Sequence, residues 1–341
     1  MAQITSNSAQ IKCINVELVK NTLRNLATGT KQDVAKATGL SVATCNTILN
    51  ELVETGEVLA DELAPSYSGR PARRYTFNAN YSLIACIYMY NKNGAHTITY
   101  TVVNLKGEIL EECCVQKKIS YEKIENVIDE LIERYTNIKA VGIGVPGLVN
   151  QGVVGVCDID ELVGIPLGLL LKEKYLLKII IGNGTNLTAL GFYHNQGYQE
   201  ETIVTIHFSK KNYPGAGIIV DGRILQGSTG FAGEISFLPY DCSREEQLKQ
   251  LNSNEGFIPL VVKTICSFIA VINPSSIMMV GDLFATEMLD EIRASCLKFI
   301  PQEHMPSLFI SASYHEVYMR GLIFKTLESL TYNIELIEKK I

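Results

Sequence analysis

The first 55 residues carry an apolar pattern that predicts three short helices. In the first helix the apolar residues stand three or four positions apart, which places them on one face: Val16, Val19, Leu23 and Leu26. Thr30 and Asp33 then form a start signal for a second helix, which runs to about Thr38. Gly39 is expected to end that helix in a left-handed turn, because other residues resist this conformation.

A third helix follows at once, with Ser41 as its expected N-cap. Its inner stripe repeats at helical spacing: Cys45, Ile48, Leu49 and Leu52. A helix, a tight glycine turn and a second helix are the arrangement of a helix-turn-helix. After Gly56, residues 57–60 and 74–77 have strand character and flank a loop, 61–73, that contains SGRPARR. We interpret this segment as a wing, a β-hairpin with an arginine-bearing tip.

From residue 81 onwards strand and helix patterns alternate, which favours an α/β architecture. The first set of expected strands is 83–90, 97–104, 108–115, 140–145 and 178–181, with helices near 121–135 and 167–174. The second set is 203–209, 217–220, 223–225, 277–280 and 308–311, with helices around 257–272 and 284–297. NLKGEIL (104–110) and VDGRIL (220–225) echo each other, which indicates a duplicated lobe with a cleft between the copies. A final helix, 316–340, is expected to tie the lobes together.

Composition and charge narrow the function classes. The chain has 341 residues and a net charge of −6, so no bulk polycationic character predicts binding to nucleic acid, although a local face remains open. Residues 1–80 hold eight basic and seven acidic residues, a net charge of +1, whereas the remainder of the chain has a net charge of −7. The nine cysteines are odd in number and scattered without a CxxC pair, which is typical of reduced thiols in a cytoplasmic protein. The longest apolar run, 260–272, is too short to span a bilayer, so we expect no membrane partner.

The third helix offers an outward face of small and polar residues that suits the major groove of double-stranded DNA. That face consists of Val42, Ala43, Asn46, Thr47 and Asn50. Ser41 and Thr44 lie in the first turn, where the helix dipole favours phosphate. Arginines in the wing are suited to a narrow minor groove: Arg70, Arg73 and Arg74. The alternatives are a helical bundle used for dimerisation and an ordinary solvated basic loop.

Several segments together resemble the ROK family (repressor, open reading frame, kinase). NVELVKNTL, DVAKATGLSVATCNTILNELVETGEV and SGRPARRYTFN are similar to the N-terminal winged helix of its repressors. GIGVPGLVN (142–150), NGTNLTALG (183–191), GAGIIVDGRILQGSTGFAGEI (215–235) and NPSSIMMVGD (273–282) follow its effector domain in order. The resemblance implies a winged helix-turn-helix over 1–78 and a two-lobed, actin-like domain of the ribonuclease H-like sugar-kinase superfamily over 79–341. Lobe one would span about 79–185, and lobe two about 186–341, with the C-terminal helix closing on the first lobe.

The departures from the family pattern bear on catalysis. Kinases of the family carry an aspartate in an NDAN-like motif as the base of phosphoryl transfer, and here the motif reads Asn183, Gly184, Thr185 and Asn186. The two expected phosphate-binding glycine turns read NKNGA and KKNYP. The family's GEIGH motif and zinc-binding cysteines are reduced to GEISF (233–237) and Cys242, too few ligands for zinc. We therefore predict no catalytic residue, no cofactor and no structural metal.

A ligand pocket would remain at five positions: Pro146, Gly147, Asn183, Asn186 and Glu234. In the resembled family, the positions of Asn183 and Glu234 contact sugar hydroxyls. Gly184 and Phe237 replace the family's Asp and His, so we expect a more apolar pocket. The alternative is that Glu234 only satisfies backbone amides in a vestigial cleft.

Together these inferences predict a bacterial-type transcriptional regulator, and we interpret it as a repressor. It would bind operator DNA as a homodimer or a dimer of dimers and respond to a small molecule, a sugar or sugar derivative, in the interlobe cleft. The alternatives are a sugar kinase with an atypical active site and an interaction scaffold that binds neither DNA nor effector.

Overall fold

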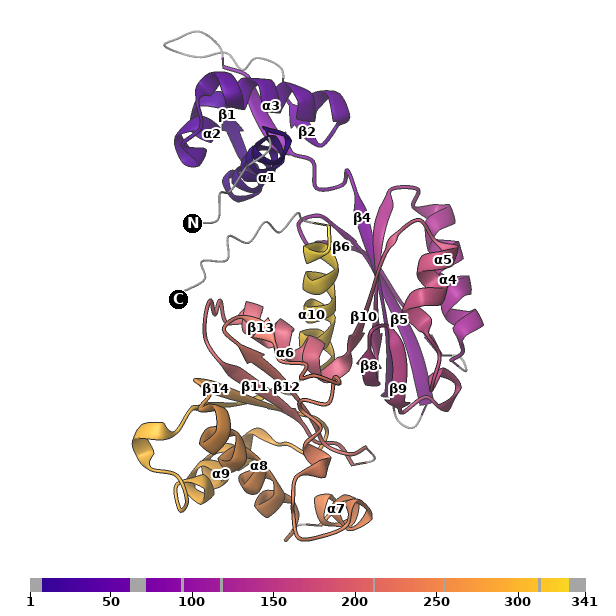
Figure 1. Cartoon of the computed structure of the whole chain (residues 1–341), viewed down its shortest axis with the longest axis vertical. Coiled ribbons are helices and arrows are strands. Elements are labelled where there is room, and N and C mark those ends of the chain that lie inside the picture. The colour runs from indigo at the N-terminus through magenta and orange to yellow at the C-terminus, as the bar shows by residue number, and fades with distance from the viewer. Residues whose placement is uncertain are drawn as a thin grey trace.

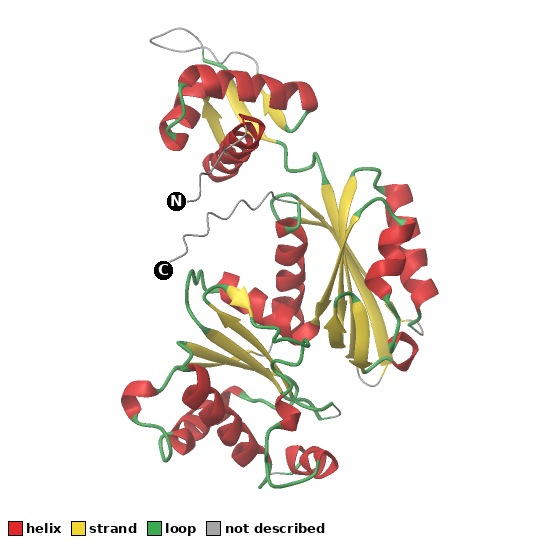
Figure 2. Ribbon diagram, in the orientation of Figure 1, coloured by secondary structure: helices red, strands yellow, loops and turns green. Residues whose placement is uncertain are grey.

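The computed structural model describes residues 8–61, 72–92, 95–116, 119–210, 212–253, 255–311 and 314–330. A small N-terminal module leads by a single connection into two α/β lobes, and one helix, α10 (Tyr314–Glu328), runs between those lobes (Figures 1 and 2). Three separate clusters of buried hydrophobic side chains form the cores of the N-terminal module, of the outer side of lobe one and of the outer side of lobe two.

The N-terminal module contains three helices and a small antiparallel sheet. Its helices are α1 (Ser8–Leu26), α2 (Lys31–Thr38) and α3 (Val42–Thr55), and its strands β1 (Thr28–Thr30), β2 (Val58–Ala60) and β3 (Arg74–Phe77) lie in the order β1-β3-β2. The predicted caps are present: Thr30 and Asp33 form a capping box, Gly39 has φ +73°, and Ser41 caps α3. The predicted inner stripe of α3 is buried in full.

Two details of this module differ from the sequence prediction. β1 was not expected, because three residues are too few to show a period of two. Leu26, predicted to face inward, is 40% exposed. It is the last residue of α1, so its side chain lies at the edge of the module, against Gly29.

Lobe one is a five-stranded sheet covered on both faces. The strands β4 (Leu83–Lys92), β5 (Ala95–Asn104), β6 (Ile109–Gln116), β7 (Ile138–Val145) and β10 (Lys178–Asn183) lie in the order β10-β7-β4-β5-β6. Helices α4 (Tyr121–Arg134) and α5 (Leu167–Lys174) cover the outer face, and α10 lies against the inner one (Figure 1). A hairpin of β8 (Gly147–Asn150) and β9 (Val153–Cys157), followed by the short 3-10 helix Asp160–Leu162, was not predicted.

Lobe two repeats this plan. Its strands β11 (Ile203–His207), β12 (Gly215–Val220), β13 (Arg223–Ile224), β14 (Ser276–Val280) and β15 (Ser307–Ser311) lie in the order β13-β12-β11-β14-β15, the same topology as in lobe one. The outer helices are α8 (Phe257–Ile272) and α9 (Leu289–Cys296), and α7 (Arg244–Leu251) is a polar helix at the periphery. Short 3-10 helices span Ile235–Phe237, Thr286–Met288 and Gln302–His304. In both sheets three antiparallel strands precede two parallel ones, as the echo between 104–110 and 220–225 indicated.

Helices α6 (Gly184–Asn195) and α10 pack against each other between the lobes. The approach is so close that a Cβ on Gly191 would clash with the backbone of Val317, and one on Gly321 would clash with the backbone of Leu187. The sequence did not predict α6, because eight of its residues are buried and it has no polar face that would give an amphipathic period. The final helix was predicted over 316–340; α10 covers the first part, and residues 331–341 lie outside the described residues.

Candidate functional site

The outward face of α3 is the first candidate surface. Val42, Ala43, Thr47 and Asn50 are exposed, and Asn46 is half-buried. They lie opposite the buried stripe that anchors the helix in its module. The Thr47 hydroxyl donates to the carbonyl of Ala43 at 3.2 Å, which keeps that side chain close to its own helix while its oxygen can still accept a hydrogen bond. The face therefore offers small side chains and amide groups without a charged residue.

The N-cap residue of α3 already binds one of the backbone amides in the first turn of the helix. Ser41 Oγ accepts a hydrogen bond from the Thr44 amide at 3.1 Å and lies 2.8 Å from the Thr44 hydroxyl. This cap uses the amide of Thr44. The first hydrogen bond within the helix runs from the Cys45 amide to the Ser41 carbonyl, so the amides of Val42 and Ala43 have no acceptor inside the helix. Those two amides are the groups that remain suited to a phosphate.

The wing is described only at its base. The amide of Asp61 donates to the carbonyl of Arg74 at 3.0 Å, which closes the hairpin beside the β2–β3 pair. Arg73 and Arg74 are exposed at the start of β3. Arg70 and the rest of 62–71 lie outside the described residues, so the predicted role of Arg70 stays a prediction.

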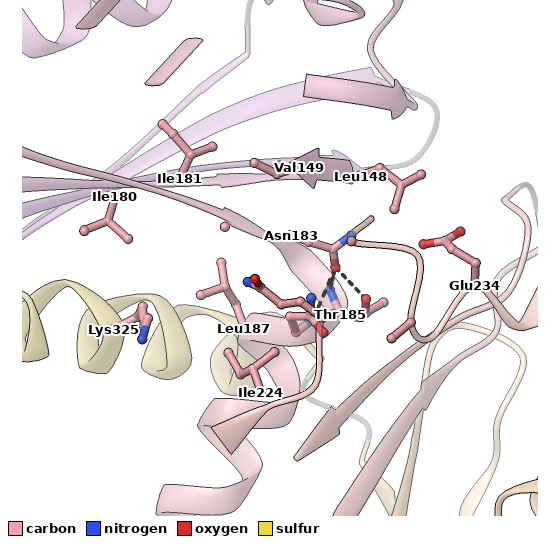
Figure 3. Close-up of a pocket in the computed structure, with 15 residues that line it drawn as sticks. Leu148, Val149, Ile180, Ile181, Asn183, Thr185, Leu187, Ile224, Glu234 and Lys325 are labelled. Carbon is pink, nitrogen blue, oxygen red and sulfur yellow. Dashed lines mark hydrogen bonds between the residues drawn. The ribbon is translucent and has the colours of Figure 1, made fainter. Parts of the chain in front are cut away.

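A pocket opens between the lobes and is the second candidate site. It has a cavity volume of about 60 Å³ and is lined from both lobes and from α10 (Figure 3). Its lining residues are Leu148, Val149, Ile180, Ile181, Gly182, Asn183, Thr185, Asn186, Leu187, Ile224, Gln226, Gly230, Ala232, Glu234 and Lys325. Three of the five predicted ligand-binding residues are among them. Gly184 and Phe237, on which the expectation of a more apolar pocket was based, are not among the lining residues.

Asn183 works mainly as a structural group in this pocket. It is the N-cap of α6, and its Oδ1 accepts hydrogen bonds from the amides of Thr185 and Asn186 at 2.8 and 3.2 Å and from the Thr185 hydroxyl at 2.5 Å. Its Nδ2 donates to the carbonyl of Gly147 at 2.7 Å. The side chain therefore ties β8 to the start of α6, and little of its hydrogen-bonding capacity remains for a ligand.

Pro146 and Gly147 are not among the residues that line the pocket. The Pro146 carbonyl accepts from the Asp158 amide at 3.0 Å, and a Cβ on Gly147 would come within 2.5 Å of the Cys157 Cα. Gly147 is thus required by the close approach of β8 and β9. Gly147 holds Asn183 through its carbonyl, and the direct ligand contact predicted for Pro146 and Gly147 stays a prediction.

Asn186 and Glu234 are two polar residues of the pocket lining that keep hydrogen-bonding capacity for a ligand. The Oδ1 of Asn186 is buried and has no hydrogen-bond partner among the described residues. The Glu234 carboxylate makes no hydrogen bond within the described part of the chain, and Figure 3 shows it turned toward the side where Asn183 lies. Burial raises the pKa of Glu234, and the positive charge of Arg244 opposes that shift. A buried carbonyl oxygen and a partly desolvated carboxylate are groups that a polyhydroxylated ligand would satisfy.

Aromatic side chains fill the space beside Gly184, where the resembled kinases place their catalytic aspartate. A Cβ on Gly184 would lie 3.3 Å from the hydroxyl of Tyr314 and 3.7 Å from Cζ of Tyr318. Burial raises the pKa of Tyr314 to about 12, so this hydroxyl is neutral. The Tyr314 ring stacks on His207 at a centroid distance of 4.7 Å. Tyr88 lies 5.7 Å from Tyr318, ring to ring, and its hydroxyl is 2.5 Å from Nε2 of His315. We refer to this set as the interlobe aromatic cluster: Tyr88, His207, Tyr314, His315 and Tyr318.

Sequence reasoning missed this cluster and part of the pocket. The partners of His207 and His315 lie on other elements, and Tyr88 lies within an apolar strand, so no local sequence pattern marks these residues. Lys325 was missed because it comes from the last helix and belongs to no local motif. Among the described residues, no group of three or more His, Cys, Asp or Glu side chains is placed to hold a metal ion. In the same part of the chain, no helix is both long and apolar enough to cross a membrane.

Comparison with known proteins relates this architecture to one family. Residues 92–249 match the model of the ROK family. The chain is 28% identical over 243 residues to a xylose repressor of Caldicellulosiruptor bescii (67% of this chain, 59% of that protein). It is 25% identical over 252 residues to the DNA-binding transcriptional dual regulator NagC of Escherichia coli K12 (70% and 60%). The chain thus spans about three fifths of the length of these relatives.

A solved structure extends the similarity to nearly the whole chain. It is described as a ROK family transcriptional regulator, a homologue of the E. coli MLC protein, and it matches with a TM-score of 0.69 and 20% identity over 93% of this chain and 96% of that chain. At this identity the match establishes the fold, the two-lobed sugar-kinase-like architecture, and the residues of each site must be argued from their own geometry.

Proposed function

We propose that this chain, whose residues 92–249 match the ROK family model, is a transcriptional repressor whose affinity for DNA is set by a sugar or sugar derivative bound between its lobes. Residues 1–78 would form a winged helix-turn-helix that reads DNA, and residues 79–341 would form the effector and dimerisation domain. In this proposal the protein acts on operator DNA in the cytoplasm, without a membrane partner. The relatives named as repressors of xylose and as NagC support the assignment.

The observation that carries the proposal is the outward face of α3. The helix is anchored by four buried side chains, and its opposite side presents Val42, Thr47 and Asn50 to solvent. An asparagine amide can pair with the edge of adenine, and a methyl group can contact the methyl of thymine. One such helix covers only a few base pairs, so two copies in a homodimer, or in a dimer of dimers, would read half-sites about 34 Å apart.

The pocket provides a physical route from ligand to DNA. Asn186 lines it from α6 and Glu234 from the 230–234 loop of lobe two, while Leu148 and Val149 come from lobe one. A sugar that contacts all of these groups would favour one interlobe angle and so one spacing of the two reading helices. A coupling of about 1 to 3 kcal/mol would change the DNA affinity roughly 5- to 150-fold.

The kinase alternative requires a catalytic base and room for a phosphoryl group beside it. Gly184 has no carboxylate, and the space next to it is filled by Tyr314 and Tyr318 of α10. Glu234 stands elsewhere in the pocket, on lobe two. We therefore propose a non-enzymatic role. A coupled assay for ADP release with hexoses, pentoses and amino sugars tests this directly: sugar-dependent turnover that Glu234→Ala abolishes would establish the kinase.

DNA recognition is tested by selecting duplexes from a random pool with the full chain and measuring the dissociation constant by fluorescence anisotropy. Asn50→Ala and Thr47→Ala should each weaken binding to the selected duplex by roughly 5- to 150-fold, because a lost base contact costs about 1 to 3 kcal/mol. Gln196→Ala, on the exposed end of α6, is the matched control and should leave binding unchanged. If both α3 variants bind like the wild type, α3 does not read the groove.

A further inference from the structure

Glu234 is held between two exposed phenylalanines. Its amide donates to the carbonyl of Phe231 at 3.2 Å, and its own carbonyl accepts from the amide of Phe237 at 3.0 Å, so the three residues form a tight double turn. The rings of Phe231 and Phe237 are 5.0 Å apart and tilted by 54°, and the two residues are 46% and 52% exposed. Gly230, Ala232 and Glu234 line the pocket, so the backbone segment that carries the two rings runs along its edge, although neither ring is among the lining side chains.

The ring of Phe237 packs against a cation. The guanidinium carbon of Arg244 lies 4.1 Å from the centroid of the Phe237 ring and 3.9 Å from that of Tyr213. Its Nη2 donates to the hydroxyl of Ser236 at 3.2 Å. This sandwich is a cation–π arrangement that holds the ring in place although half of the residue is in solvent. A pre-positioned and exposed aromatic ring loses little conformational freedom when a ligand stacks on it.

We propose that Phe231 and Phe237 form a second subsite at the edge of the pocket, which receives the second ring of a disaccharide or the apolar aglycone of a glycoside. The inference rests on the proposed function, in which the pocket binds a sugar. Glu234 lines the pocket and belongs to the same turn as the two phenylalanines, so a ligand that reaches beyond Glu234 would meet their rings. Sugar rings and aglycones have C–H faces that pack on aromatic surface, while the Glu234 carboxylate accepts hydrogen bonds from the hydroxyls of the first ring.

Calorimetric titration of the full chain with matched ligands tests the subsite. The pairs are xylose with xylobiose, N-acetylglucosamine with its β-1,4-linked dimer, and methyl with phenyl β-D-xyloside. The second ring should tighten binding roughly 3- to 10-fold, which is the range that one aromatic contact supplies. Phe237→Ala should remove that gain and leave the affinity for the one-ring ligand unchanged, whereas Glu234→Gln should weaken both members of a pair.

Phe299→Ala is the matched control, because Phe299 is 72% exposed beyond α9 and far along the chain from the pocket. Phe237→Leu and Phe231→Leu keep an apolar side chain and repeat the test if the alanine variant fails to fold. Equal wild-type affinity for one- and two-ring ligands, or equal losses for both in Phe237→Ala, would overturn the subsite while leaving the sugar-binding proposal standing. If no ligand of the panel binds at all, the proposed effector function falls and the subsite falls with it.

Discussion

Replacing Asn183 by alanine separates a structural from a ligand-binding role for this residue. The change removes the acceptor of two α6 amides and the donor to the Gly147 carbonyl. Loss of an N-cap costs about 1 kcal/mol and loss of a net hydrogen bond a further 1 to 1.5 kcal/mol. We therefore expect the free energy of opening of the α6 region to fall by about 2 to 2.5 kcal/mol, because the helix start and the β8–β9 hairpin lose their shared bond.

The N-terminal module has a core of its own, so a single global unfolding transition would mix two events. Native-state hydrogen exchange followed by mass spectrometry isolates the peptides of α6. In Asn183→Ala these amides should exchange roughly 30- to 60-fold faster than in the wild type, the equivalent of about 2 to 2.5 kcal/mol.

Asn183→Ser keeps the cap and should recover about half of the loss. Asn195→Ala removes a hydrogen bond to Arg320 on the exposed end of the same helix and should change exchange by less than a factor of about 2, as for other surface positions. Unchanged α6 exchange in Asn183→Ala, accompanied by lost sugar affinity, would refute the reasoning and assign the side chain to the ligand.

Three other contacts each give a prediction. Gly184→Asp should produce no sugar-dependent ADP release and should lower the melting temperature, because the new side chain meets Tyr314 and Tyr318; restored turnover would show that the aromatic cluster does not block catalysis. Ser41→Ala should cost about 1 kcal/mol of N-terminal module stability in urea unfolding, since the Thr44 amide loses its acceptor, whereas Ser267→Ala on α8 should leave that module unaffected. Burial lowers the pKa of His207 to about 4, so its contribution to stability is present above the ordinary pKa of about 6.5 and is lost as the pH falls toward 4. Between pH 7 and pH 4 the urea midpoint should therefore fall more steeply for the wild type than for His207→Gln. If the midpoint falls equally in both proteins, His207 is not the cause of the pH dependence.

The N-terminal module was predictable because its signals are local. The capping box at Thr30 and Asp33, the glycine at position 39 and the stripe that begins at Cys45 each depend on residues within one or two turns. The duplicated sheets were predictable for a similar reason, since each strand carries its own apolar run and the 104–110 and 220–225 turns repeat. The short strand β1 has too few residues to carry a signal of this kind.

The interlobe region was harder to predict because its contacts join distant parts of the chain. Helix α6 is buried on almost every side and shows no polar face, so the criterion of amphipathic spacing does not apply. Tyr88 and His315 are 227 positions apart, and Lys325 reaches the pocket from the last helix. The sequence could name Asn183 and Glu234 through the family resemblance, but only the structure separates the capping role of Asn183 from the open carboxylate of Glu234.

Anisotropy titration of a selected duplex, with and without a sugar that the protein binds, tests the central claim most directly. The account predicts nanomolar to micromolar binding that weakens with salt, is lost in the Thr47→Ala, Asn50→Ala double variant, and shifts roughly 5- to 150-fold when the sugar is added. A protein that ignores every duplex at low ionic strength, or whose DNA affinity is the same with the sugar bound, would contradict it.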